Sequence, residues 1–365
     1  MRQGFSGRVA IAGVGMTPLT RRSGRTELDL AVAAARAALE DAALDGGVDA
    51  VLSYHLNDSA PVTHVARELG ITPLGWHNEI HGGGTQCASI LGDAAMLIDA
   101  GVARSVLVYR ALNGRSGVRM NTASLRLGTG EDFTLPYGMA GPVHAFAHVA
   151  QRYLYDRGLD EDALADVVIA SRRNAAANPR ALRRDPLDRA GYTAAPMVAS
   201  PLRRADCCQE TDGACALVLT SASRAPHAPR VHAVVRGGGP GASDPAGAPD
   251  LTRLFSAYVA GPLYDAAGMT PADVDVALLY DAYSFLVPCQ ESDFGLAGVP
   301  VNPHGGLLSE GYVHGLNNVA EAVRQLRGDG VNQVAGAEVA LVTGFGGSYG
   351  SAAILVSGTA RRTGS

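Results

Sequence analysis

The chain has 365 residues and a formal net charge of −5, which argues against nucleic acid as its main partner. Its hydrophobic content of 47% is enough for a large buried core in one or two domains. All 30 basic residues are arginine, so Schiff-base chemistry on a lysine is excluded. The apolar runs are too short to span a bilayer and residues 1–13 lack the organisation of a signal peptide, so we expect a cytoplasmic protein without a membrane span.

The first part of the chain alternates predicted strands with predicted helices. In chain order the pattern gives a strand at 8–16, a helix at 27–44, a strand at 48–54, an apolar helix between the glycine turn at 83–84 and Gly101, and a strand at 104–112. Such alternation predicts an α/β protein with a mostly parallel sheet covered on both faces.

The pattern restarts after the Gly/Pro/Ala-rich link at 237–250. A strand at 230–238 precedes this link, and helices and strands follow within 270–283, 317–328 and 338–358. We therefore predict an internal duplication, with an N-terminal half at 1–225 and a C-terminal half at 226–365. Residues 111–200 lack the strand–helix rhythm and are predicted to form an inserted loop domain above the sheet, where α/β enzymes build substrate pockets.

The five cysteines do not suggest disulfides or a metal site. Their number is odd, none forms a CxxC pair and metal-ligand spacing is absent. His144 and His148 have the i, i+4 spacing that suits a metal, but no third ligand accompanies them, so we favour a packing or pocket-lining role. The cysteines are expected to be mostly small buried residues: Cys87, Cys207, Cys208, Cys215 and Cys289.

Four segments together suggest a family. In chain order they are SRRNAAANPRA (171–181), DCCQETDGACALVLTSASRA (206–225), NPHGGLLSEGYVHG (302–315) and GFGGSYG (344–350). They resemble the thiolase superfamily, and within it the sterol-carrier-protein-type thiolases, over nearly the whole chain. The resemblance implies a thiolase fold, in which two similar βαβαβ-type halves form a five-layered αβαβα sandwich.

The chain departs from the thiolases at each catalytic position. The nucleophilic cysteine position falls on Gly84, with Cys87 about one helical turn further on. The Gly-His-Pro histidine falls on Tyr312, and the final catalytic cysteine on Gly344. The Asn-Glu-Ala-Phe-type loop corresponds to DAYSF (281–285), which puts Asp281 at the Asn position with Tyr283 beside it.

This combination resembles the thiolase-like aldolases of steroid side-chain degradation. The resemblance implies retro-aldol cleavage of a bulky, steroidal tertiary β-hydroxyacyl-CoA to a ketone and a short acyl-CoA such as propionyl-CoA. It carries the two active-site tyrosines of that branch to Tyr283 and Tyr312. It implies no cofactor beyond the CoA of the substrate, a homodimer, and a small acyl-CoA-binding partner built of a zinc ribbon and an OB fold.

Other groups could support the two tyrosines. His304 and His314 lie close in sequence to Tyr312 and could lower the pKa of a phenol, and Tyr349 could compete with Tyr283 for its role. We expect backbone N–H groups at Gly84 and Gly346 to stabilise the thioester enolate as an oxyanion hole.

Two other functions stay open from the sequence. One is a thiolase-type acyltransferase that uses Cys87 in a shifted register, since a helix N-terminus lowers the pKa of a thiol. The other is a non-catalytic acyl-CoA- or lipid-binding subunit. The loop at 295–301 is shorter than in related chains, so the acyl group and the partner contact are not determined.

Overall fold

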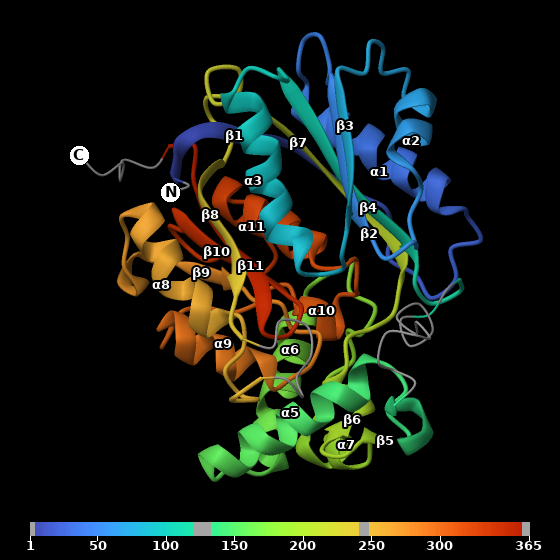
Figure 1. Ribbon diagram of the computed structural model, residues 1–365, viewed down its shortest axis with the longest axis vertical. Coiled ribbons are helices and arrows are strands. Elements are labelled where there is room, and N and C mark those ends of the chain that lie inside the picture. Colours follow the sequence, from blue (N-terminus) through green and yellow to red (C-terminus); the bar gives the residue numbers. More distant parts are fainter. Residues whose placement is uncertain (1–3, 118, 120–132, 241–247, 360–365) are drawn as a thin grey trace.

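The computed structural model describes residues 4–117, 119, 133–240 and 248–359. A nine-stranded sheet runs through these residues in the order β3-β2-β4-β7-β1-β8-β11-β10-β9. Figure 1 shows the sheet between helices, with a separate group of helices at one end of the molecule.

Without the segment between β4 and β7, residues 4–221 contribute five strands and three helices. They are β1 (Gly4–Met16), α1 (Glu27–Ala42), β2 (Ala50–His55), α2 (Val62–Glu68), β3 (Trp76–His81), α3 (Gln86–Asp99), β4 (Ser105–Asn113) and β7 (Asp212–Ser221). The C-terminal half contributes β8 (Arg230–Gly238), α8 (Ser256–Ala267), η5 (Pro271–Asp273), β9 (Val276–Leu278), α9 (Leu286–Phe294), α10 (Gly306–Ser309), α11 (Leu316–Arg327), β10 (Val339–Phe345) and β11 (Tyr349–Val356).

The sheet is mixed, so the expected mostly parallel sheet is wrong. β2 pairs in parallel with β3 and β4, and β9 pairs in parallel with β10. The remaining neighbours, from β4 through β7, β1, β8 and β11 to β10, are antiparallel. A parallel neighbour needs a crossover connection, whereas the glycine-rich turn between β10 and β11 has room only for a direct reversal.

The strand order repeats within the sheet. The order β2-β4-β7-β1 of the first half is matched by β9-β10-β11-β8 in the second. Val301 forms a parallel bridge with Ala277 of β9, at the place that β3 occupies beside β2. This repeat supports the proposed division of the chain near residue 225.

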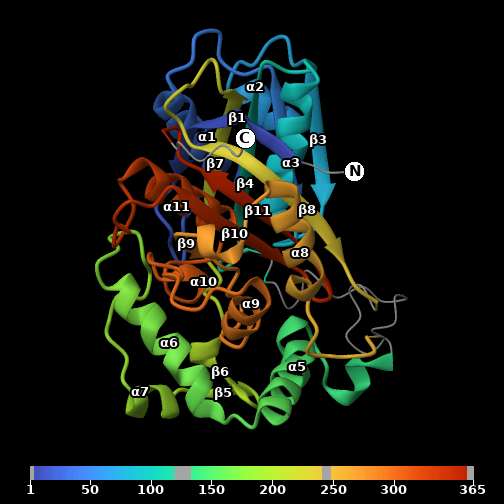
Figure 2. The same cartoon turned by 90° about the vertical axis from the view of Figure 1, so that its left-hand side faces the viewer.

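Two helices form the central layer of the sandwich. α3 and α11 contact strands of both halves and also contact each other. α1 packs on β1, β7 and β4, and α8 packs on β8 and β11, so each covers an outer face (Figures 1 and 2). Much of α3 consists of small buried residues, which allow strands from both ends of the sheet to approach it closely.

Residues 133–206, between β4 and β7, form the lower part of Figures 1 and 2. The described elements of this segment are η2 (Leu135–Tyr137), α5 (Pro142–Arg157), α6 (Glu161–Ala175), α7 (Arg189–Thr193), β5 (Met197–Ala199), β6 (Leu202–Arg203) and η3 (Arg204–Asp206). α6 packs against α10 of the C-terminal half, directly before the loop that carries Tyr312 (Figure 2). In the described part of the chain, no helix is long and apolar enough to cross a membrane.

Candidate active site

Two buried tyrosines from the second part of the chain meet beside the turn that precedes α3. The hydroxyl groups of Tyr280 and Tyr312 lie 2.6 Å apart, which is the distance of a strong hydrogen bond. Tyr280 follows the short strand β9, and Tyr312 lies on the glycine-flanked loop between α10 and α11. Tyr312 is 4% exposed and Tyr280 is 2% exposed, so this polar contact is shielded from water.

The predicted partner Tyr283 is displaced from this pair. Its ring stacks on Phe285 and lies 5.5 Å, between centroids, from Phe146 of α5. Phe146 in turn lies 5.0 Å from Phe345, and Phe345 lies 6.1 Å from Tyr280. Tyr283 is therefore part of a row of aromatic rings beside the phenol pair, and the hydroxyl that reaches Tyr312 is that of Tyr280.

Gly84 leaves the space that the Tyr280 hydroxyl fills. A Cβ atom at position 84 would overlap with the Tyr280 hydroxyl and its ring carbon. Position 84 directly precedes Thr85, the N-cap of α3, so the phenol lies at the N-terminus of this buried helix. A side chain at residue 84 and the present position of Tyr280 exclude each other.

The final glycine loop lies against the same turn. A Cβ atom at Gly344 would lie 2.5 Å from the Gly84 carbonyl oxygen, and one at Gly346 would overlap with the Thr85 side chain. The turn at Gly84–Thr85 and the loop at Gly344–Gly346 therefore lie against each other. Tyr349 lies at the start of β11, beside Gly346, with 37% of its surface exposed.

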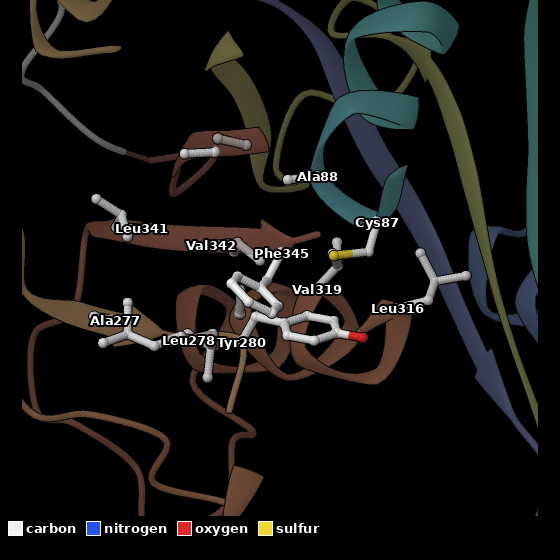
Figure 3. Packing of buried hydrophobic residues seen from close by; sticks show 14 of the residues in the cluster. Cys87, Ala88, Ala277, Leu278, Tyr280, Leu316, Val319, Leu341, Val342 and Phe345 are labelled. Carbon is white, nitrogen blue, oxygen red and sulfur yellow. The ribbon is translucent and has the colours of Figure 1, made fainter. Parts of the chain in front are cut away.

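Cys87 is fully buried next to Tyr280. Its sulfur points toward the rings of Tyr280 and Phe345 (Figure 3) and lies 3.4 Å from the Thr343 carbonyl oxygen. The side chain is fully buried, and this burial raises the pKa of the thiol to about 12. A nucleophilic cysteine needs a thiolate, so this environment does not favour acyl transfer by Cys87.

The two phenols have different electrostatic surroundings. Burial raises the pKa of both well above the usual range for tyrosine. For Tyr280, the charge and hydrogen bond of Tyr312 raise the pKa further. For Tyr312, Cys208 raises the pKa further, whereas the hydrogen bond with Tyr280 and the positive charge of Arg110 partly counteract the increase. Tyr312 therefore has a buried cation acting on it, although its pKa stays above the usual range.

His314 belongs to a second buried group beside Tyr312. The two rings meet edge to face at 4.9 Å between centroids. The Nδ1 atom of His314 lies 3.0 Å from Nε and 2.8 Å from Nη2 of Arg110, and Arg110 Nη2 donates to Asp58 at 2.6 Å. Burial and the adjacent guanidinium lower the pKa of His314 to about 3, so the imidazole is neutral at physiological pH.

His304 and Asp281 support the turn before Tyr312. Asp281 accepts hydrogen bonds from the N–H groups of Leu307 at 2.8 Å and Leu308 at 3.4 Å, and burial raises its pKa to about 6. His304 Nε2 lies 3.1 Å from Asn318 Oδ1 and 3.7 Å from a carboxylate oxygen of Glu310. In these positions both predicted residues hold the loop that presents Tyr312.

Three site residues were not predicted: Tyr280, Arg110 and Asp58. Tyr280 is the last residue of the apolar run VALLY, which reads as a buried strand before the DAYSF loop, although β9 ends at Leu278. Arg110 is a lone charged residue in the apolar strand SVLVYRAL, and this pattern is a signal that could have been used. Nothing local in the sequence marks Asp58.

Comparisons with known proteins agree with this geometry. Residues 296–359 match the Thiolase C-terminal domain-like family. The chain is 37% identical over 391 residues to the 17-hydroxy-3-oxo-4-pregnene-20-carboxyl-CoA lyase of Mycobacterium tuberculosis, which covers 96% of this chain and 100% of that protein. It is 34% identical over 389 residues to the steroid side-chain-cleaving aldolase of Thermomonospora curvata, covering 96% of this chain and 98% of that protein.

A solved structure extends the similarity to three dimensions. The Ltp2-ChsH2(DUF35) aldolase matches with a TM-score of 0.89 and 34% identity, covering 97% of this chain and 99% of that chain. The chain therefore belongs to the thiolase superfamily, and within it to the family of enzymes that includes these steroid side-chain-cleaving aldolases.

Proposed function

We propose that the protein cleaves a bulky, steroidal β-hydroxyacyl-CoA with a tertiary hydroxyl group by a retro-aldol reaction. The products are a ketone and a shorter acyl-CoA, which is propionyl-CoA for a 17-hydroxy-3-oxo-4-pregnene-20-carboxyl-CoA substrate. The observation that carries this proposal is the contact between the Tyr280 and Tyr312 hydroxyls in the space that Gly84 leaves open. The names of the similar proteins supply the substrate class.

In this proposal Tyr312 is the base. Its phenolate takes the proton of the substrate hydroxyl, and the oxygen lone pair forms the ketone C=O bond. The bond between the α and β carbons breaks, and its electron pair enters the thioester enolate. Tyr280 stabilises the phenolate by donating its hydrogen bond, which the 2.6 Å contact allows. The proton on Tyr312 then moves to the α carbon of the enolate and regenerates the base.

The enolate oxygen needs hydrogen-bond donors because it carries the developing charge. We propose that backbone N–H groups of the turns at Gly84 and Gly346 supply them, since these turns lie against each other beside Tyr280. One such preorganised donor contributes roughly 3–4 kcal/mol to catalysis. No cysteine nucleophile takes part in these steps, in agreement with the buried position of Cys87.

The row of aromatic rings provides a surface for an apolar acyl group. Tyr283 and Phe146 are only partly buried and adjoin the phenol pair through Phe345. Flat apolar side chains of this kind suit a rigid ring system, because they bury its surface with little loss of side-chain entropy. We propose that Tyr283 contacts the acyl group and that Tyr280 takes the acid–base role expected of it.

We further propose a homodimer and a DUF35-type partner. β3 is an edge strand of the sheet, and Trp76 at its start is 45% exposed, which suits pairing with a second copy. The similar solved aldolase is named as a complex with ChsH2(DUF35), which supports the expected small acyl-CoA-binding partner with a zinc ribbon and an OB fold.

Product analysis tests the reaction. The purified protein, with and without a DUF35 partner, is incubated with 17-hydroxy-3-oxo-4-pregnene-20-carboxyl-CoA, and the products are identified by mass spectrometry. We expect a 17-ketone and propionyl-CoA in equal amounts, and loss of both in Tyr312→Phe. Product that forms only on addition of free CoA would instead indicate acyl transfer, and binding without product would indicate a non-catalytic subunit.

A further inference from the structure

A buried ion pair between Arg110 and Asp58 lies beside His314, whose ring contacts that of Tyr312. Arg110 of β4 is 0% exposed and Asp58, in the loop after β2, is 8% exposed. Both residues come from the N-terminal half, whereas Tyr312 and His314 come from the loop between α10 and α11. Arg110 reaches across to this loop through its contacts with His314 Nδ1.

Burying a guanidinium is costly unless its N–H groups are paired. Arg110 donates from Nη2 to Asp58 at 2.6 Å, from Nη1 to the Ala111 carbonyl oxygen at 2.7 Å and from Nε to His314 at 3.0 Å. This arrangement fixes the guanidinium in one orientation. A polar cluster of this kind is unnecessary for packing, because apolar residues of the same volume commonly stabilise a core as well or better.

The guanidinium also fixes the tautomer of His314. Arginine carries only N–H donors, so the Nδ1 atom that faces it must accept. The proton of the neutral ring is therefore on Nε2. The backbone of His314 has a positive φ of 47°, and its carbonyl oxygen accepts a hydrogen bond from Tyr54 at 3.0 Å. His314 is therefore held through its backbone as well as through its ring.

We infer that Asp58, Arg110 and His314 are positioning residues that set the proton affinity of Tyr312, on the basis of the proposed role of Tyr312 as the base. Arg110 provides a permanent positive charge that favours the phenolate, Asp58 fixes that charge and partly offsets it, and His314 connects the cation to the loop without titrating. The titratable and charged groups around Tyr312 include Tyr54, Tyr280, Tyr283, Cys208, Arg110 and Asp58, together with His314 in ring contact and Glu210, which forms a parallel bridge with Tyr312.

The two members of the ion pair have opposite electrostatic effects on Tyr312. Arg110 lowers the pKa of the phenol and Asp58 raises it, and the effect of Arg110 is the larger. Removing Asp58 alone should therefore ease ionisation of Tyr312, whereas removing both charges should oppose it. A purely structural role for the pair would not produce shifts of opposite sign.

The test measures the ionisation of Tyr312 directly. The protein is labelled with ¹³Cζ-tyrosine, and the Tyr312 signal among the 12 tyrosines is assigned with Tyr312→Phe. We expect ionisation of Tyr312 to begin at lower pH in Asp58→Asn and at higher pH in Asp58→Asn/Arg110→Gln than in the wild type. The double variant leaves no uncompensated buried charge, so it is preferred to Arg110→Gln alone. If the double variant does not fold, the downward shift in Asp58→Asn decides the question.

Two further variants serve as controls. Arg8→Gln breaks an exposed pair, with Asp99 at 2.7 Å, and should leave the Tyr312 titration unchanged. His314→Asn keeps an oxygen that can accept from Arg110 and tolerates the positive φ, so it should retain more of the wild-type titration than His314→Ala.

Unchanged titration in both Asp58 variants, or shifts in the same direction, would overturn the inference. The NMR readout does not require turnover, so shifts of the expected sign in a protein without aldolase activity would refute the proposed function and leave the positioning role intact. In an active enzyme, the alkaline rise of kcat/KM should move with the Tyr312 titration.

Discussion

Gly84 and Tyr280 are sterically dependent on each other: the hydroxyl of Tyr280 lies where any side chain at residue 84 would begin. The same hydroxyl lies 2.6 Å from that of Tyr312. Loss of a side chain at the start of α3 is therefore what allows two phenols to meet at this point. In the proposed mechanism this pair of phenols performs the acid–base chemistry, and no covalent nucleophile is needed at residue 84.

Replacement of Gly84 by alanine should displace Tyr280 and break the phenol contact. We expect Gly84→Ala to lower kcat by about 100-fold or more, since a positioned acid or base contributes about 10²–10⁴. Steady-state kinetics with the steroidal CoA thioester measures the loss. The matched control is Gly261→Ala in α8, where a Cβ atom meets open space. This control should keep wild-type activity and gain up to about 1 kcal/mol in the free energy of unfolding.

Gly84→Cys restores the thiol of a thiolase but not its environment. The new side chain would compete with Tyr280 for space, and the thiolase histidine position is occupied by Tyr312. We expect no CoA-dependent thiolysis of a β-ketoacyl-CoA. Restored thiolysis in this single variant would contradict the mutual exclusion of residues 84 and 280.

The tyrosines should differ in their contribution to catalysis. Tyr312→Phe removes the base, and Tyr280→Phe removes the donor to it, so each should lower kcat by roughly 10²–10⁴. Tyr283→Phe keeps the ring contacts with Phe146 and Phe285, and should change kcat by less than about tenfold. A larger loss in Tyr283→Phe than in Tyr280→Phe would reassign the second catalytic phenol to Tyr283.

Tyr283 was expected at the site because the resemblance matches DAYSF (281–285) to the Asn-Glu-Ala-Phe-type loop, whereas the hydroxyl that meets Tyr312 belongs to Tyr280, directly before this loop. The run ALLYDAY gives no local stop, but in the structure β9 ends at Leu278, and the carboxylate of Asp281 binds the amides of Leu307 and Leu308. This turn directs Tyr280 toward Gly84 and Tyr283 toward Phe146. Arg110 and His314 are 204 residues apart in sequence, so only the folded chain shows their contact.

Elements of the fold could be predicted where buried apolar residues form a recognisable run in the sequence, whereas the site residues leave no such run. β1, α1, α3 and β4 were anticipated from runs of buried apolar residues. β3, with the sequence WHNEIH, was missed because its side chains are mostly exposed and its strand state depends on pairing with β2. α8 was also missed, since it contains Pro262 in its interior.

Cys87 should be unreactive in the folded protein. Burial raises its thiol pKa to about 12, so at pH 8 it is protonated and shielded from solvent. Incubation with iodoacetamide followed by peptide mass spectrometry should show Cys87 unmodified until denaturant is added, with aldolase activity retained. Rapid alkylation of Cys87 together with loss of activity would support the acyltransferase alternative.

The titration of Asp281 should make the free energy of unfolding depend on pH. Its pKa in the folded protein is about 6, mainly because of burial, and lies above the usual value of 3.8. Between these two pKa values the folded state binds more protons than the unfolded state. The contribution of Asp281 to the free energy of unfolding is therefore fully present at low pH and is lost as pH rises through about 6. The loss amounts to about 3 kcal/mol.

Asp281→Asn removes this titration and keeps an oxygen for the Leu307 amide. Between about pH 4 and pH 6, the wild-type free energy of unfolding should therefore fall relative to that of the variant, and the difference should be constant above this range. Urea unfolding of both proteins across this range measures the difference. A difference that does not vary with pH would show that Asp281 is already ionised at pH 4.

The most direct test of the account is cleavage of the steroidal β-hydroxyacyl-CoA in D₂O without free CoA. Retro-aldol cleavage through an enolate predicts equal amounts of ketone and short acyl-CoA, with one deuterium on the α carbon of each acyl-CoA product. In Tyr312→Phe both products should fall together. Cleavage that requires free CoA, or an acyl-CoA product without deuterium, would contradict the central claim that two tyrosines in a thiolase fold perform acid–base carbon–carbon cleavage.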